Sequence, residues 1–150
     1  MWDEQLLKYG AELIIMRSEF IKELNPLIAG IHAGLSGGKE TLSIAYEPNV
    51  TADNFREQLA KNQFQEIKQR QTLTGPHRDD LNFIVNGTDI RRFGSQGQQR
   101  TAALSLKLAE IELVKKIVKD YPVLYWMMSF LNLTARDRNI YFQKLPTSRP

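Results

Sequence analysis

The chain has 150 residues, a formal net charge of +3, and 42% hydrophobic and 25% charged residues, a composition typical of a soluble globular protein with one modest core or two small lobes. The absence of cysteine excludes disulfides, thiolate zinc sites and cysteine nucleophiles, and the small positive charge permits contact with phosphate backbones without requiring it. No apolar run approaches the ~18 residues that cross a bilayer and no export signal opens the sequence, so we expect a cytoplasmic protein with no membrane partner.

The opening segment predicts a long amphipathic helix that ends at a Ser36-Gly37-Gly38 break. We expect Pro26 to kink this helix or restart it near its end, because proline has no amide hydrogen to donate. We interpret the segment as an ordinary packed helix rather than a partner-binding zipper, which needs more heptads. Two apolar rows with seven-residue spacing share one face of the helix: Leu6, Leu13, Phe20 and Leu27, and beside them Leu7, Ile14, Ile21 and Ile28.

A strand and a second helix are expected next. Residues 41–46 alternate in the manner of a strand, and Pro48-Asn49 turns the chain. Thr51 or Asp53 can cap a helix that runs to about Arg70. The apolar side of that helix is predicted to contain Phe55, Leu59 and Ile67.

The following segment predicts a hairpin and a long helix. After the charged turn at residues 75–80, Leu81, Phe83 and Val85 alternate, and Asn86-Gly87 is a strong signal for a two-residue hairpin. Residues 101–118 predict a helix that is apolar on most of its circumference and is therefore covered on more than one side. A buried strand is expected to start at Val123-Leu124.

Between the hairpin and this helix lies a polar, glycine-containing loop, which is the arrangement that binds anions at a helix start. Ser95 can cap the helix and offer its hydroxyl to a phosphate, and Gly97 lets a phosphate approach the backbone. Further donors come from Gln98, Gln99 and Arg100. From local chemistry alone, the alternative is a capped helix that binds nothing.

Three blocks of this region resemble RecF, a family of bacterial DNA-repair ATPases related to the ABC and SMC ATPases. The blocks are residues 75–80, residues 93–101 (Phe-Gly-Ser-Gln-Gly-Gln-Gln-Arg-Thr) and residues 106–110. The resemblance extends from about Trp2 to Leu124 and is most specific from Gly75 to Glu112. It implies that the second block is an ABC-type signature, which contacts the γ-phosphate of ATP held by the other subunit of a head-to-tail dimer. The phosphate contacts that it implies are Ser95, Gln96, Gly97 and Gln98, with His77 and Arg78 as candidates that support the nucleotide site.

The resemblance also implies a fold, partners and a cellular role. We expect an α/β or α+β fold, a partial ABC-type ATPase head with a helical arm lobe in residues 1–72 and the signature-bearing part of the head in residues 73–124. The implied partners are single-stranded and gapped duplex DNA, a second RecF subunit and RecR, in DNA replication, recombinational repair and the SOS response. Candidate DNA contacts are Arg91, Arg92, Lys115 and Lys116, although such a basic surface can also be a solvated face.

A complete ATP site also needs a P-loop, and the nearest match, Gly38-Lys39-Glu40, departs from that motif twice. Ala33 stands where the first glycine belongs, and Glu40 stands where the metal-binding hydroxyl belongs. Because the P-loop of the family lies nearer its N-terminus, we expect Met1 to be an internal start or a fragment boundary. ATP and Mg²⁺ belong to the intact family, and neither is expected to bind well to this chain alone. We assign no catalytic residue and no metal ligand, and expect no ATP hydrolysis by this chain alone.

The tail departs from the family where paired aspartates are expected after Leu124. Tyr125-Trp126-Met127-Met128 must be encoded as TAY-TGG-ATG-ATG, which in a shifted frame becomes YTG-GAT-GAT, or Leu-Asp-Asp. Our hypothesis is therefore a one-base deletion near Leu124 that leaves residues 125–150 out of frame and poorly ordered. The alternatives are a divergent C-terminus for the tail and, for the whole chain, a non-enzymatic DNA- or partner-binding module or a non-functional pseudogene product.

Overall fold

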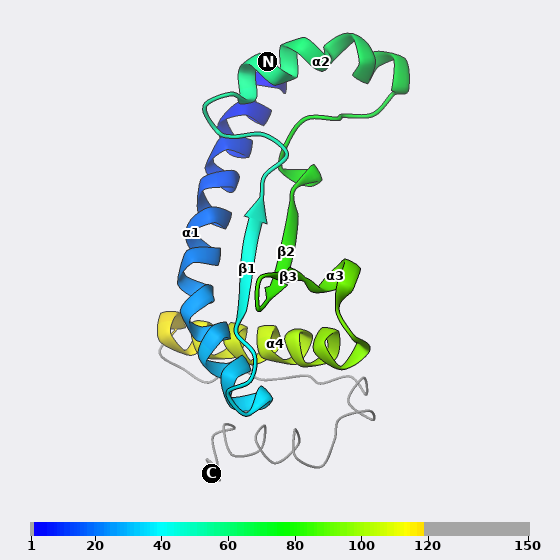
Figure 1. Ribbon diagram of the computed structural model, residues 1–150. Coiled ribbons are helices and arrows are strands. Elements are labelled where there is room, and N and C mark those ends of the chain that lie inside the picture. Colours follow the sequence, from blue (N-terminus) through cyan, green and yellow to red (C-terminus); the bar gives the residue numbers. More distant parts are fainter. Residues whose placement is uncertain (1, 119–150) are drawn as a thin grey trace.

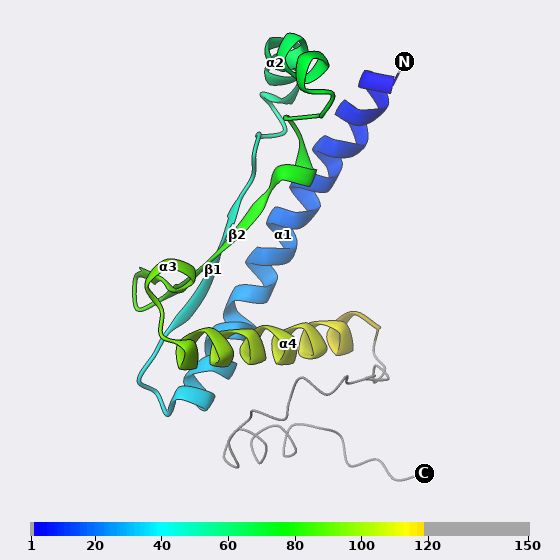
Figure 2. The same cartoon turned by 90° about the vertical axis from the view of Figure 1, so that its right-hand side faces the viewer.

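One long helix organises the structure. The computed structural model describes residues 2–118, in which the 35-residue helix α1 (Trp2–Ser36) runs beside a small sheet and is crossed near its C-terminal end by α4 (Gln96–Val118) (Figures 1 and 2). Helix α2 (Phe55–Gln69) lies at the opposite end, near the N-terminus. The remaining elements are β1 (Leu42–Glu47), the 3₁₀ turn η1 (Pro76–Arg78), β2 (Asp80–Val85), β3 (Thr88–Asp89) and α3 (Ile90–Phe93). This mixture of helices with an antiparallel sheet confirms the expected fold class.

The sheet joins two distant parts of the sequence. Its strand order is β1-β2-β3, and β1 pairs antiparallel with β2 from Leu42 opposite Val85 to Glu47 opposite Asp80. The predicted hairpin is confirmed, because Asn86 and Gly87 have φ values of 49° and 81° and connect β2 to β3 in two residues. The pairing of β1 with β2 thus connects the described parts of the two predicted regions, residues 2–72 and 73–118, through one sheet.

The main core forms where α1, the sheet and α4 meet. Of the two predicted rows on α1, Ile14, Ile21 and Ile28 are buried, whereas Leu13 and Phe20 are 38% and 45% exposed. The expectation that both rows share one packed face is therefore wrong for Leu13 and Phe20, whereas Leu6 and Leu27 of the same row do pack against the core clusters. Helix α4 contributes Ala102, Leu104, Leu108, Ala109 and Leu113 to this core, together with Leu42, Ile44 and Val85 from the sheet.

Helix α1 does not restart at Pro26, contrary to one form of the prediction. The side chain of Asn25 accepts from the Ile44 amide at 2.8 Å and donates to the Ile44 carbonyl at 2.9 Å, which fixes the helix to β1 at this level. Leu24 and Ile28 on either side of the proline are completely buried. Because packing and this double hydrogen bond hold both turns in place, they offset the hydrogen bond that proline cannot make.

Helix α2 differs from the prediction in its cap and its apolar side. Asn54 rather than Thr51 or Asp53 precedes the first turn, and its side chain makes no capping hydrogen bond. Phe55 is 1% exposed, but Ile67 is 70% exposed, because α2 extends away from α1 after its first turn (Figure 1). The helical pattern therefore predicted the element correctly but not the surface that it buries.

No helix within residues 2–118 is both long and apolar enough to cross a membrane. The predicted strand at Val123-Leu124 and the predicted out-of-frame tail at residues 125–150 lie outside the described residues.

Candidate functional site

Helix α4 starts with a reciprocal cap. The Ser95 hydroxyl oxygen accepts from the Gln98 amide at 3.2 Å, and the Gln98 side-chain oxygen accepts from the Ser95 amide at 3.0 Å. This pattern is a capping box, in which two backbone donors at a helix start are satisfied by each other's side chains. The prediction that Ser95 caps the helix is confirmed, and α4 begins at Gln96, five residues before the predicted start at Thr101.

The first turn of α4 presents donors to solvent. Ser95, Gln96 and Gly97 are exposed. The Gln99 amide bonds to the Ser95 carbonyl at 3.0 Å, whereas the amides of Gln96 and Gly97 have no acceptor within the described part of the chain. A side chain at Gly97 would meet only the Ser95 hydroxyl, at 3.8 Å, so the backbone here is open to close approach. Two free amides at the positive end of a 23-residue helix are chemically suited to an anion such as phosphate.

A chain of polar side chains supports this turn from behind. The Gln98 side-chain nitrogen donates to Glu40 at 2.9 Å, the second oxygen of Glu40 lies 3.3 Å from His32 Nε2, and His32 Nδ1 lies 2.9 Å from the Ser105 hydroxyl. His32 is completely buried. Burial lowers the pKa of His32, and the hydrogen bond and charge of Glu40 oppose that shift in part.

No sequence motif reveals the role of these partners. In the sequence, Glu40 is only a departure from the P-loop pattern, and His32 belongs to no motif. The only local signal was the Gly37-Gly38 pair, whose positive φ values of 68° and 77° end α1 and place Glu40 after the turn. The Gly38 amide bonds back to the Ala33 carbonyl at 2.8 Å, which is the geometry of a helix C-terminus and not of a loop that opens a helix.

His77 and Arg78 lie in η1, at the far end of β2 from the hairpin. His77 Nε2 is 2.9 Å from the Thr72 carbonyl, and the Arg78 guanidinium approaches the same oxygen at 3.4 and 3.5 Å. Neither residue hydrogen-bonds to the loop at residues 93–100 within the described part of the chain. Both side chains are exposed, so His77 and Arg78 remain candidates for contacts with a nucleotide or with another subunit.

The four candidate DNA contacts do not form one basic patch. Arg91 pairs with Asp80 at 2.8 Å and Arg92 with Asp89 at 3.6 Å, whereas Lys115 pairs with Glu112 at 3.0 Å. The hydrogen bond from Arg91 also lowers the pKa of Asp80. Lys115 and Lys116 lie in the last turn of α4, roughly 30 Å along the helix axis from its start at 1.5 Å per residue. Nearby carboxylates therefore offset much of the positive charge. Arg91 and Arg92 lie on a different surface from Lys115 and Lys116.

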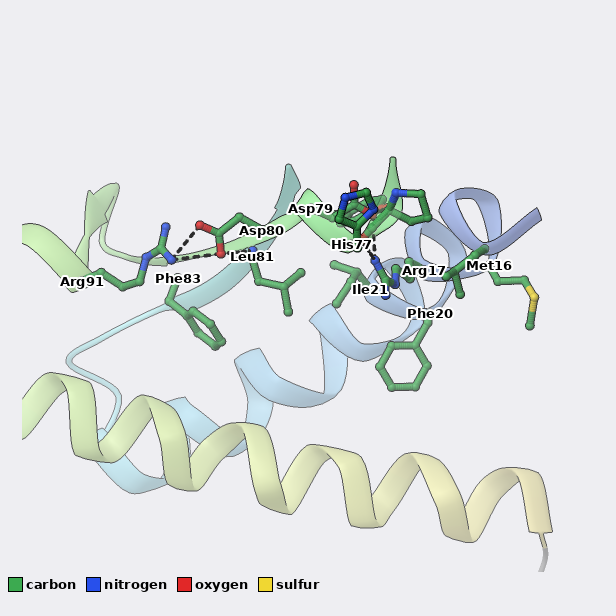
Figure 3. A pocket seen from close by; sticks show the side chains of 13 residues that line it. Met16, Arg17, Phe20, Ile21, His77, Asp79, Asp80, Leu81, Phe83 and Arg91 are labelled. Atoms are coloured by element: carbon green, nitrogen blue, oxygen red, sulfur yellow. Dashed lines mark hydrogen bonds and ion pairs between the residues drawn. The ribbon is translucent and has the colours of Figure 1, made fainter. Parts of the chain in front are cut away.

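A groove of about 760 Å³ lies between α1, η1 and β2 (Figure 3). Its wall includes Leu13 and Phe20 of α1 and also Asp79, whose side chain is 4% exposed. Asp79 accepts hydrogen bonds from Arg17 at 2.8 Å, from the Tyr46 hydroxyl, and from the Asn49 amide at 2.9 Å. Burial, followed by the hydrogen bond to Asp79, raises the pKa of Tyr46 to about 12. Asp79 therefore holds the 75–80 turn against α1 and β1.

The described residues fit a phosphate better than a metal ion. The start of α4 offers backbone and hydroxyl donors, which match phosphate oxygens. No group of three or more His, Cys, Asp or Glu side chains within residues 2–118 is arranged to hold a metal ion.

Comparison with known proteins relates the chain to RecF. No family model matches the sequence. The chain is 54% identical over 124 residues to "DNA replication and repair protein RecF" of Lachnoclostridium phytofermentans, covering 83% of this chain and 34% of that protein. The protein of the same name from Bacillus mycoides is 48% identical over 130 residues, covering 80% and 35%. A solved structure described as the recombination mediator protein RecF-ATP in the RecFOR pathway matches with a TM-score of 0.82 and 31% identity, covering 97% of this chain and 41% of that one. The chain thus spans about one third of the length of the curated relatives it matches.

Proposed function

This chain is homologous to RecF over about one third of that protein's length, and on that basis we propose that it supplies the signature half of an ATP site shared between two RecF-type subunits. In this proposal, the start of α4 contacts the γ-phosphate of ATP held by the other subunit. The observation that carries the proposal is the exposed first turn of α4, with two backbone amides free at its positive end. A solved RecF structure described with ATP supports the use of this nucleotide in the family.

The donors proposed to contact phosphate come from four consecutive residues. Ser95 can donate its hydroxyl hydrogen, because within residues 2–118 its oxygen only accepts, from the Gln98 amide. Gln96 and Gly97 contribute their amides, and Gln98 contributes the second hydrogen of its side-chain nitrogen, since the first is bound to Glu40. In an enclosed site, each such donor stabilises charge that develops on the transferred phosphoryl group.

The proposal assigns no ATP hydrolysis to the chain alone. The Gly37-Gly38 turn ends a helix, whereas a phosphate-binding loop must open one so that its amides and the helix dipole face the phosphates. In addition, Glu40 places a carboxylate where the motif needs a hydroxyl. Mg²⁺ is assigned no ligand in residues 2–118, and His77 and Arg78 remain proposed supports of the nucleotide site from the 75–80 turn.

The proposed cellular role follows the relatives. We place the chain in the cytoplasm, in DNA replication and recombinational repair, with single-stranded or gapped DNA, a second RecF subunit and RecR as partners. The description of the solved RecF structure as a recombination mediator in the RecFOR pathway supports this role. Arg91, Arg92, Lys115 and Lys116 are the proposed DNA contacts, and salt-dependent binding of a single-stranded oligonucleotide by the chain would test them.

The test of the ATP-site proposal is complementation of a defective subunit. RecF from Lachnoclostridium phytofermentans, with its own signature serine replaced by arginine and its P-loop intact, is assayed for ATP turnover with and without this chain. We expect the chain to raise turnover at least tenfold, because removal of a single donor to developing charge lowers kcat by about 10²–10³. The variant Ser95→Arg should not raise it, whereas Ser43→Arg, at an exposed position on β1, should act like the unchanged chain. No gain in turnover, or an equal gain with Ser95→Arg, would contradict the proposal.

A further inference from the structure

Glu40 connects the interior of the fold to the signature loop. One of its carboxylate oxygens accepts from the side-chain nitrogen of Gln98 at 2.9 Å, and the other faces Nε2 of His32 at 3.3 Å. The Glu40 side chain is 23% exposed, whereas His32 is 0% exposed. The carboxylate is therefore held between a fixed buried ring and the first turn of α4.

His32 donates to Glu40 in both of its protonation states. The Ser105 hydroxyl has one hydrogen and two neighbouring acceptors, the Thr101 carbonyl at 2.7 Å and His32 Nδ1 at 2.9 Å. When the ring is neutral, Ser105 can donate to Nδ1, and the ring hydrogen is on Nε2. When the ring is charged, Nδ1 donates to Ser105 and Ser105 donates to the Thr101 carbonyl. The Ser105 hydroxyl is compatible with either neutral tautomer, but a carboxylate only accepts, so the charge of Glu40 favours the ring hydrogen on Nε2.

The orientation of the Gln98 amide depends on this carboxylate. A side-chain amide has one accepting end and one donating end, and rotation by 180° exchanges them. With the nitrogen bound to Glu40, the oxygen faces the Ser95 amide and accepts from it at 3.0 Å. In the rotated amide, a nitrogen would face the Ser95 amide and an oxygen would face the carboxylate, so both contacts would be repulsive. The negative charge of Glu40 therefore selects the orientation that closes the capping box.

We propose that Glu40, oriented by His32, is a positioning residue for the signature loop: it sets the direction of the Gln98 amide and so holds Ser95 in the geometry that presents its hydroxyl and the Gln96 and Gly97 amides to a phosphate. The expected effect of Glu40 on ATP turnover rests on the proposed function. The coupling between Glu40 and the Ser95 amide, 55 residues apart in sequence, does not depend on nucleotide.

The first test measures amide hydrogen exchange by NMR on the full chain without nucleotide. In Glu40→Gln, the new side chain can present either an oxygen or a nitrogen to Gln98, so it no longer fixes which end of the Gln98 amide faces the Ser95 amide. We expect exchange at the Ser95 amide to rise by up to about tenfold, as for the loss of a hydrogen bond to a neutral amide oxygen. The matched control is Glu23→Gln on the exposed surface of α1, which should leave exchange at Ser95 unchanged.

A second pair of variants separates positioning from packing. His32→Gln keeps a donor that can reach Glu40, whereas His32→Leu removes it, and both lose the ring. The inference predicts slower Ser95 exchange in His32→Gln than in His32→Leu, and equal rates in the two would contradict it. The Ile44 amide, which donates to Asn25 at 2.8 Å within the main core, reports global unfolding. If its exchange also rises in Glu40→Gln, the difference between the two His32 variants decides whether Glu40 acts by positioning.

The two hypotheses fail in different experiments. Unchanged Ser95 exchange in Glu40→Gln overturns the positioning role and leaves the proposed ATP-site function standing. Absence of complementation by the unchanged chain overturns the ATP-site function, even if Glu40→Gln alters the Ser95 amide. If both stand, Glu40→Gln should lower kcat in the complementation assay with little change in the KM for ATP, because the signature loop contacts the phosphate and not the base or ribose.

Discussion

The substitution Asp79→Ala should destabilise the fold by roughly 3 kcal/mol, because it removes the acceptor for three hydrogen bonds. Arg17 is 41% exposed, so its pairing with the carboxylate is screened by water and contributes only about 1 kcal/mol. The half-buried Tyr46 hydroxyl would lose a charged acceptor, at a cost of about 1–2 kcal/mol. The exposed Asn49 amide can turn to water, which adds at most about 1 kcal/mol.

Urea unfolding followed by far-UV circular dichroism measures this free energy for the full chain. The matched control is Asp53→Ala, which changes an exposed aspartate in the loop before α2 and should alter the free energy of unfolding by less than about 0.5 kcal/mol. A loss below about 1 kcal/mol for Asp79→Ala, or equal losses for the two variants, would refute the role of Asp79 as the brace of the 75–80 turn.

Three further predictions concern pH and packing. Because burial lowers the pKa of His32 below its usual 6.5, the folded state binds fewer protons than the unfolded state near and below that pH. The free energy of unfolding should therefore fall as the pH decreases below about 6.5, by up to about 1.4 kcal/mol per pH unit until the folded pKa is reached. In urea titrations at several pH values, His32→Gln should remove this slope. Because the pKa of Tyr46 is raised to about 12, its contribution to stability should be complete below about pH 10 and be lost between pH 10 and 12, and ultraviolet titration of the tyrosines should show one late component that is absent in Tyr46→Phe. A methyl group at Gly10 would overlap the Phe55 ring, so Gly10→Ala should lower the melting temperature through a cost of about 1–3 kcal/mol. Gly30→Ala, with open space around it in the same helix, should instead raise stability by about 0.5–1 kcal/mol.

Local features of the fold could be predicted from the sequence. The Asn86-Gly87 hairpin, the end of α1 at Gly37 and the cap at Ser95 each depend on residues within a few positions of one another. Their backbone requirements, positive φ or a side-chain acceptor at a helix start, are visible in residue type alone. The position and type of these elements are predicted correctly because they depend on local residues alone.

Features that depend on distant partners could not be predicted. Arg17 and Asp79 are 62 residues apart, and Glu40 and Gln98 are 58 residues apart. Periodicity also does not tell which of two adjacent rows on a helix meets a neighbour, and Phe20 is accordingly half exposed at the groove in Figure 3. Hydrogen bonds and packing of this kind arise only once β1 pairs with β2 and α4 crosses α1.

The nucleotide-binding role came from resemblance and not from local chemistry. A capped helix start with Ser95 and Gly97 is common in proteins that bind no anion. What the structure adds is the fixed orientation of the Gln98 side chain and the two amides left free beside it. These features give the proposal a geometry that single substitutions can test.

The most direct test of the central claim is nucleotide-dependent binding between this chain and an intact subunit. Isothermal titration of the chain into Lachnoclostridium phytofermentans RecF is performed in the presence of either a non-hydrolysable ATP analogue or ADP. If the start of α4 contacts the γ-phosphate, binding should be at least tenfold tighter with the ATP analogue, and Ser95→Arg should abolish that difference while Ser43→Arg preserves it. Equal affinity with the two nucleotides, or a preference for the ATP analogue that survives Ser95→Arg, would contradict the account.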